Sequence, residues 1–386
     1  MPQILLVNPF SSTKYLSNRF KEYGIKTVAL YTIDLATVLA YSLPPSNLFD
    51  LQVKITSNDL ESIIKALGDN QFDYVINGLE AYVELSDKLA AYYVPKYANN
   101  PATYFLRSDK YEMHKKLATK ELSHIQQVLY DTHDSLPNKI NNASELANYF
   151  KGTDKYKNIW QTDKNRDKFL ISEYIDGLAE LLVDTFSVNG QHYISTIQMY
   201  HKDLFKSKPF CCYSQVIRDK ALETLVVDYI KKVLDATEFH NGFAHTELFL
   251  LPNNELKLIE INARVSGGHG TINRLAFLSN HVDHISLFMK HIFGKNEQEK
   301  IDNAYYRRLY LFNLSGKPLQ NLEDNLKIYK TVQEITQIVP DGHVIASLDN
   351  VDLSAAVAFV ILRSENFKEI EDDTQKILAT DKIGWN

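Results

Sequence analysis

Two stretches in the middle of the chain decide the fold: Ala244-His245-Thr246-Glu247-Leu248-Phe249-Leu250-Leu251 and Leu256-Lys257-Leu258-Ile259-Glu260-Ile261-Asn262-Ala263-Arg264. Both are strand-like and a short polar connection joins them, so they predict a β-hairpin. If Asn253-Asn254 is a two-residue turn, Glu247 lies opposite Glu260 and His245 lies opposite Asn262. Because side chains alternate between the faces of a strand, the face that carries the two glutamates also carries Asn262 and Arg264.

The opposed carboxylates indicate a bound cation. Like charges that face each other across a ladder are destabilising, and the flanking apolar residues predict that both faces of the hairpin are largely covered. Two buried carboxylates at this distance must share a proton or a cation. Two carboxylates and the Asn262 amide are hard oxygen ligands that suit magnesium, and Arg264 adds a positive charge for a developing oxyanion. The alternative is a solvent-exposed acidic strand paired with lysines, because a turn shifted by one residue would break the pairing.

A glycine-rich loop follows the hairpin directly. Val265-Ser266-Gly267-Gly268-His269-Gly270 places three glycines in four positions after a buried strand. Such a loop lets backbone N–H groups approach an anion, although a plain turn would have the same composition. Together, the loop and the acidic hairpin favour a magnesium–phosphate site.

The remainder of the chain predicts several domains. Residues 1–100 alternate strands (4–7, 27–31 and 74–76) with helices, which is typical of a parallel sheet. The first strand ends in Asn8-Pro9-Phe10-Ser11-Ser12-Thr13 and lacks the G-x-G-x-x-G of a dinucleotide-binding fold. We therefore expect a structural α/β domain whose strand ends line a small-molecule cleft. After about residue 168 the pattern changes to strands and hairpins, with a helix at 219–234.

Composition excludes several classes of protein. The 386 residues include 42 basic and 48 acidic side chains, a net charge of −6, which is not the basic footprint of a nucleic-acid binder. Two adjacent cysteines cannot form a disulfide framework. The N-terminus lacks the features of a signal peptide, and no apolar run is long enough to span a membrane. We therefore expect a cytoplasmic multidomain enzyme that binds neither nucleic acid nor membranes.

Taken in order, these residues resemble the ATP-grasp superfamily of carboxylate–amine ligases, and most closely the L-amino acid ligases that form dipeptides. The run Glu-x-Asn-x-Arg-x-Ser-Gly-Gly at 260–268 is the specific part. Weaker segments that gain weight from their order are Arg107-Ser108-Asp109-Lys110, Ser172-Glu173-Tyr174-Ile175-Asp176-Gly177, residues 180–190 and His245-Thr246-Glu247. The resemblance implies an α/β and α+β multidomain fold, in which a Rossmann-like parallel-sheet domain precedes an ATP-grasp fold of antiparallel sheet and helices. The expected divisions are 1–100 (N-terminal domain), 101–168 (small subdomain), 169–300 (catalytic subdomain) and 301–386 (C-terminal subdomain).

The resemblance also implies a role for each site residue. Lys110 would contact the ATP phosphates, the Glu173-Tyr174-Ile175 segment would bind adenine through the main chain of its first and third residues, and Glu180 would bind the ribose. Magnesium, or manganese in its place, would be held by Glu247, Glu260 and Asn262. Arg264 would stabilise an acyl-phosphate and its tetrahedral adduct, and Ser266, Gly267 and Gly268 would face the carboxylate substrate. Simpler alternatives are a solvated Lys110, an exposed Glu180, and a His245 that packs beside the metal without acting as ligand or base.

One expected segment is missing. The family has a second ATP lysine and a glycine-rich lid between the helix near Leu117 and the strand near Phe169. In this sequence Gly152 is the only glycine between Asn100 and Gly177, and Lys139 is a poor candidate for the lysine. Either the protein lacks the lid, which would weaken its grip on the phosphates, or the lid is omitted from this sequence. The intact acidic hairpin favours omission, because opposed buried carboxylates are costly without a cation.

The sequence thus predicts an ATP- and magnesium-dependent ligase that joins small carboxylate and amine substrates, amino acids by resemblance, through an acyl-phosphate. A nucleotide-binding pseudoenzyme with a regulatory role is the alternative if the lid is truly absent. A metal-dependent hydrolase is a third hypothesis, which predicts activity without nucleotide. The identity of the substrates and the oligomeric state, including a homodimer, stay open.

Overall fold

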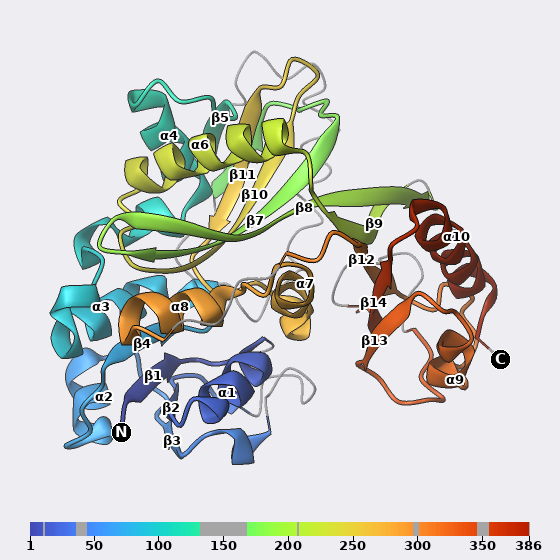
Figure 1. The fold of residues 1–386 in the computed structure, drawn as a ribbon. Helices are drawn as coiled ribbons and strands as arrows, with labels where there is room; N and C mark the ends of the chain where they lie inside the picture. The colour runs from blue at the N-terminus through green and yellow to red at the C-terminus, as the bar shows by residue number, and fades with distance from the viewer. Residues whose placement is uncertain are drawn as a thin grey trace.

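The computed structural model describes residues 1–10, 12–35, 45–131, 168–206, 208–295, 301–345 and 355–385. Two large sheets dominate it, with the N-terminal domain on one side of the molecule and the C-terminal part at the far end of the second sheet (Figure 1). Residues 132–167, where the family would have its second ATP lysine and lid, lie outside the described residues. None of the described helices is both long and apolar enough to cross a lipid bilayer.

The N-terminal domain is the expected parallel α/β unit. Its four strands run in the order β3 (Leu51–Lys54), β2 (Lys26–Tyr31), β1 (Gln3–Val7) and β4 (Tyr74–Asn77), all parallel. Three helices cover the sheet: α1 (Thr13–Glu22), α2 (Leu60–Leu67) and α3 (Val83–Tyr93). Strand β1 is buried on both faces, which is why its sequence is a continuous apolar run.

The second sheet has eight antiparallel strands. In spatial order they are β11 (Leu256–Asn262), β10 (Gly242–Leu250), β7 (Ala179–Val188), β8 (Gln191–Phe205), β9 (Lys208–Val216), β12 (Tyr305–Leu311), β14 (Ala358–Ser364) and β13 (Val332–Gln337). Strand β12 pairs with β9, so the sheet continues from the strands of residues 179–216 into the C-terminal part (Figure 1). Residues 169–300 and 301–386 therefore share one sheet. A separate two-stranded sheet joins β5 (Gln127–Asp131) to β6 (Lys168–Ser172).

The helices bury opposite faces of the large sheet. Helix α6 (Lys220–Ala236) begins at an Asp219 cap and packs its apolar side, including Val226 and Ile230, against β7, β10 and β11 together with α4 (Lys110–Thr119). Helices α7 (Thr271–Asn280) and α8 (His284–Phe293) lie on the other side, and Phe288 of α8 packs between Tyr74 of the N-terminal sheet and Phe186 of the large sheet. In the C-terminal part, α10 (Phe367–Ile383) and the short α9 (Leu322–Lys327) complete the packing.

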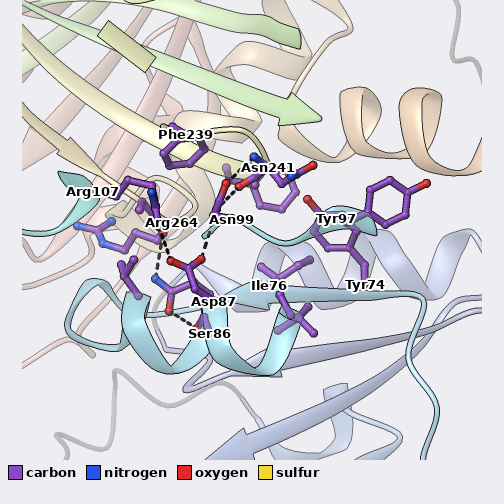
Figure 2. Close-up of a pocket in the computed structure, with 17 residues that line it drawn as sticks. Tyr74, Ile76, Ser86, Asp87, Tyr97, Asn99, Arg107, Phe239, Asn241 and Arg264 are labelled. Atoms are coloured by element: carbon purple, nitrogen blue, oxygen red, sulfur yellow. Dashed lines mark hydrogen bonds and ion pairs between the residues drawn. The ribbon is translucent and has the colours of Figure 1, made fainter. Parts of the chain in front are cut away.

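A small polar cavity of about 40 Å³ lies between the N-terminal domain and the large sheet. The Arg107 guanidinium donates to the Asp87 carboxylate at 2.7 Å, and both side chains are buried. Asn99 bridges Asp87 to the Asn241 main chain (Figure 2). Burial raises the pKa of the Asp87 carboxyl, and the nearby guanidinium opposes that rise. The Arg107–Asp87 pair therefore joins helix α3 to the segment that leads into α4. Asn99 connects this pair to the large sheet through the Asn241 main chain.

Replacing Arg107 with Met should destabilise the protein by about 3–5 kcal/mol, because the Asp87 carboxylate would be left buried without a cation. Thermal or denaturant unfolding measures this loss. Lys88→Met is the control: Lys88 follows Asp87 on α3 but pairs with Glu84 on the surface, so its loss should cost less than about 1 kcal/mol. Equal stability of the two variants would contradict the interpretation of the Arg107 pair.

Candidate active site

The acidic hairpin has the expected pairing at its functional end. Glu247 of β10 lies opposite Glu260 of β11, and His245 lies opposite Asn262. The predicted two-residue turn is wrong: the strands end at Leu250 and Leu256, and a longer connection is closed by the Leu251 N–H donating to the Glu255 carbonyl. A β-bulge at residue 259 adds one residue to β11 and restores the register beyond it.

The hairpin, α4 and the N-terminal domain bring charges of both signs together. The Lys110 ammonium, in the first turn of α4, lies 2.7 Å from the Glu260 carboxylate. The Asn262 amide nitrogen donates to the Glu260 carboxylate, and its oxygen accepts from the Arg264 guanidinium, both at 3.2 Å. The fold therefore brings Lys110 of α4 to the polar side chains of the hairpin. Together they form one continuous hydrogen-bonded group: Lys110, Glu260, Asn262 and Arg264.

Glu247 is held from behind by a buried histidine. The His245 Nε2 lies 3.6 Å from the Glu247 carboxylate, and its Nδ1 lies 2.6 Å from the Asp184 carboxylate on β7. Burial opposes a charge on His245, but the carboxylates of Asp184 and Glu247 outweigh it and raise its pKa to about 9. Both ring nitrogens thus face carboxylates, which fits a residue that orients Glu247 and does not fit a free base.

The donor set of the hairpin suits a divalent magnesium or manganese ion. Glu247 and Glu260 are partly buried, Asn262 is buried, and all three offer oxygen atoms on one face. Among the described residues, the hairpin included, no group of three or more histidine, cysteine or acidic side chains is arranged to hold a metal, so the candidate donor set is two carboxylates and one amide. Two carboxylates and an amide leave coordination positions for water and substrate phosphates, as Mg²⁺ requires.

The backbone of the glycine loop adopts a left-handed conformation that favours glycine. Gly268, His269 and Gly270 have φ values of 67°, 55° and 79° in succession. The Thr271 hydroxyl donates to the Gly268 carbonyl at 2.6 Å and fixes the turn. The Ser266 side chain is fully buried and its hydroxyl accepts from the Asn273 amide at 2.9 Å, so this hydroxyl does not line the open loop. A substrate contact at Ser266 would therefore have to use its main chain.

The residues that the resemblance assigns to adenine and ribose lie at the other end of the hairpin from Lys110. The Glu173 N–H donates to the Gln126 carbonyl, which leaves only its own carbonyl for adenine, and its carboxylate accepts from Lys257 at 2.8 Å. The Tyr174 side chain is 90% exposed and is therefore accessible to a ligand. Ile175 is half-buried in the same segment, and Glu180 at the start of β7 forms an ion pair with Lys202 of β8.

Glu80 is a site residue that the sequence analysis missed. It follows β4 at the carboxyl edge of the N-terminal sheet, in a short 3₁₀ turn (Glu80–Tyr82), and its carboxylate lies 3.9 Å from the Arg264 guanidinium. Burial raises the pKa of the Glu80 carboxyl, and Arg264 opposes the rise. Its position could have indicated a role in the site, because ligands of open parallel sheets bind at the carboxyl ends of the strands. Gly78 just before it is fixed by packing, because a Cβ there would lie 2.6 Å from the Asn8 carbonyl.

This chain is similar to known proteins both in sequence and in structure. Residues 138–273 match the family model of the ATP-grasp domain. The structure superposes on an L-amino acid ligase from Bacillus licheniformis with a TM-score of 0.77 and 15% identity, covering 98% of this chain and 97% of that one. No curated protein matches the chain at the sequence level.

Two further solved structures show the same fold. Phosphoribosylglycinamide synthetase from Anaerococcus prevotii has a TM-score of 0.68 at 14% identity, and N5-carboxyaminoimidazole synthetase from Staphylococcus aureus, complexed with ADP, has 0.69 at 12%; each alignment covers 98% of both chains. The fold is therefore that of the ATP-grasp ligases. Residues 138–273 match the ATP-grasp domain model, and in the structure a parallel-sheet domain precedes the large sheet, which continues into the C-terminal part.

Proposed function

We propose that this protein is an ATP- and magnesium-dependent carboxylate–amine ligase that joins two amino-acid-like substrates through an acyl-phosphate. The observation that carries the proposal is the hairpin: Glu247 opposite Glu260, with Asn262 and Arg264 on the same face. This set of oxygen ligands and fixed cations is suited to phosphoryl transfer, which depends mainly on positioning and charge neutralisation. The fold of the neighbouring ligases supports the same reaction class.

The proposed reaction has two steps, phosphoryl transfer to the acid substrate and attack by the amine. A carboxylate oxygen of the acid substrate attacks the γ-phosphorus of ATP, the bond to the bridging oxygen breaks, and ADP leaves. The amine then attacks the acyl carbon, an amide forms, and inorganic phosphate leaves with the acyl oxygen. Glu247, Glu260 and Asn262 would hold the magnesium ion, whose positive charge would offset the charge of the phosphates.

The chain's own cations support both steps. Lys110 is half-exposed at the start of α4, where its ammonium can move from Glu260 to a phosphate oxygen. Arg264 is anchored by the Asn262 amide and the Val265 carbonyl, so its guanidinium is already oriented for the charge that develops on the tetrahedral adduct. His245 and Asp184 keep Glu247 in place.

Glu80 is suited to the ammonium group of the acid substrate. It is the carboxylate that the N-terminal domain presents beside Arg264, so an amino acid whose carboxylate lies near Arg264 would place its α-ammonium close to Glu80. We expect Glu80→Gln to raise the KM of the acid substrate about tenfold and to change the KM of ATP little, since a hydrogen bond to a charged group contributes about 1.5–3 kcal/mol. Steady-state kinetics measure both constants.

Glu84→Gln is the control for that prediction, because Glu84 pairs with Lys88 on the surface one turn away. If Glu80→Gln and Glu84→Gln have the same kinetics, Glu80 does not contact the ammonium group.

The direct test of the function is phosphate release from Mg-ATP with single L-amino acids and with pairs, with mass spectrometry of the product. The proposal predicts release that depends on an amino acid and an amide product whose mass is the sum of the two substrates less one water. ATP binding without amino-acid-dependent release would point instead to a nucleotide-binding pseudoenzyme. Hydrolysis of a substrate in the absence of nucleotide would point to a hydrolase.

A further inference from the structure

The strand that carries Glu260 is held on its outer edge by side chains of two helices. Strand β11 pairs with β10 on one side, and among the described strands it is the last of the large sheet on the other. An edge strand has main-chain groups without ladder partners. The Tyr229 hydroxyl of α6 accepts from the Leu258 N–H at 2.9 Å. The His114 ring of α4 lies 3.4 Å from the Ile259 carbonyl, directly before Glu260.

The hydrogen bonds of His114 fix which of its ring nitrogens carries the proton. The Ile125 N–H can only donate, so Nδ1 of His114, at 3.2 Å, is the acceptor. The side chain is 2% exposed, and burial lowers the pKa of His114 to about 4, so the ring is neutral at pH 7. A neutral imidazole that accepts at Nδ1 has its proton on Nε2. His114 therefore donates to the Ile259 carbonyl and ties β11 to the segment that leads into β5.

Ile259 is the extra residue of the β-bulge in β11. Strand β10 passes directly from the residue opposite Glu260 to the residue opposite Leu258, so Ile259 has no residue opposite it. A bulge leaves its extra residue outside the ladder and lets the strand bend. The bond from His114 thus holds the strand where the ladder is interrupted, next to a carboxylate of the candidate metal site.

Helix α4 contacts the hairpin at two consecutive residues. Lys110 and His114 are four positions apart, so they share one face of the helix. The Lys110 ammonium pairs with the Glu260 carboxylate at 2.7 Å, but its side chain is 47% exposed, and in the proposed reaction it moves to a phosphate oxygen. His114 is buried and bonds to the main chain of Ile259. When Lys110 leaves Glu260, the bond from His114 still connects α4 to β11.

We propose that His114 positions Glu260 for the metal ion by holding the bulge of β11 against helix α4. This inference rests on the proposed function, because Glu260 is a metal ligand only if the hairpin binds magnesium. His114 acts through the main chain of Ile259, so it is a positioning residue. Loss of the Nε2 donor should therefore weaken magnesium binding, whereas loss of apolar packing in the same helix should not.

Calorimetric titration of the protein–ADP complex with magnesium tests this role without any need for turnover. The comparison uses the wild type, His114→Leu, His114→Asn and His114→Gln. The Asn side chain keeps an acceptor for the Ile125 N–H but is too short to reach Ile259, whereas the longer Gln side chain can place an N–H there. Groups behind metal ligands contribute about 10- to 100-fold to metal affinity. We expect His114→Leu and His114→Asn to raise the magnesium Kd about tenfold, and His114→Gln less than about threefold.

Met113→Ala is the matched control for lost packing. Met113 precedes His114 on α4, is 1% exposed and packs in the same apolar cluster as Leu117. The variant should lower the unfolding temperature and leave the magnesium Kd unchanged. The comparison of His114→Asn with His114→Gln stands even if His114→Leu does not fold. Equal weakening of magnesium binding in the Asn and Gln variants, or the same weakening in Met113→Ala, would overturn the inference.

Glu260→Gln, titrated in the same way, separates this inference from the proposed function. Weaker magnesium binding in Glu260→Gln with no change in His114→Asn would overturn the role of His114 and leave the metal site intact. Unchanged binding in Glu260→Gln would overturn both. Weaker binding in Glu260→Gln and His114→Asn, with recovery in His114→Gln, would support the inference. That pattern in a protein without amino-acid-dependent turnover would support the role of His114 and contradict the ligase proposal.

Discussion

Replacing Glu260 with Gln is expected to lower kcat about a thousandfold or more. The substitution keeps the shape of the side chain but removes one of the two opposed carboxylates and the partner of Lys110. Stabilisation of phosphoryl charge by a metal ion contributes several kcal/mol, and each 1.36 kcal/mol corresponds to about tenfold in rate. The variant should also need more magnesium for half-maximal activity, which a magnesium titration of the initial rate measures.

Glu255→Gln is the matched control for Glu260. Glu255 lies in the connection of the same hairpin, where it accepts from Ser123 away from the charged face. It should keep nearly full activity. Undiminished activity in Glu260→Gln, under conditions in which Glu255→Gln is also active, would rule out the hairpin as the metal site.

Arg264→Met is expected to lower kcat by about 10²–10³ while the KM of ATP changes little. The guanidinium is held by Asn262 and Val265 on the face of the hairpin, and in the proposed reaction it stabilises the charge at the reacting carboxyl group. Loss of one preorganised donor to an oxyanion costs about this much in other enzymes. Because the segment proposed to bind adenine, residues 173–175, lies at the other end of the hairpin, binding of ATP should be nearly unaffected.

Arg264→Lys separates charge from geometry. It restores the charge but not the planar pair of donors, so we expect partial recovery of kcat. Arg363→Met is the control, since Arg363 pairs with Asp302 on the surface of the C-terminal part. An Arg264→Met variant that loses affinity for ATP and keeps its kcat would place Arg264 at the nucleotide and away from the acyl group.

Local patterns were enough to predict the parallel N-terminal sheet and the functional end of the hairpin, whereas the ATP-grasp fold was predicted from the resemblance. The alternation of Glu260, Asn262 and Arg264 fixes which side chains share a face, and the structure confirms the pairing of Glu247 with Glu260. The turn was not predictable in the same way. The longer connection and the bulge at residue 259 compensate each other, because burial of Leu248 and Leu258 against α6 holds the strands in this register.

Contacts between distant segments could not be predicted from the chain. Glu80 and Arg264 are far apart in sequence, and only the packing of the N-terminal sheet on the hairpin brings them together. His114 has no local motif, and its bond to Ile259 depends on the packing of α4 against β11. The Ser266 hydroxyl is a similar case, because its bond to Asn273 of α7 cannot be predicted from the loop motif.

The central claim is the transfer of phosphate to a substrate carboxylate, and an isotope measurement tests it most directly. An amino acid labelled with ¹⁸O in its carboxylate is incubated with Mg-ATP, the protein and an amine substrate, and the phosphate is examined by mass spectrometry. The acyl-phosphate route predicts one ¹⁸O atom in the inorganic phosphate, with ADP and an amide as the other products. Unlabelled phosphate, or AMP and pyrophosphate in place of ADP, would contradict the account.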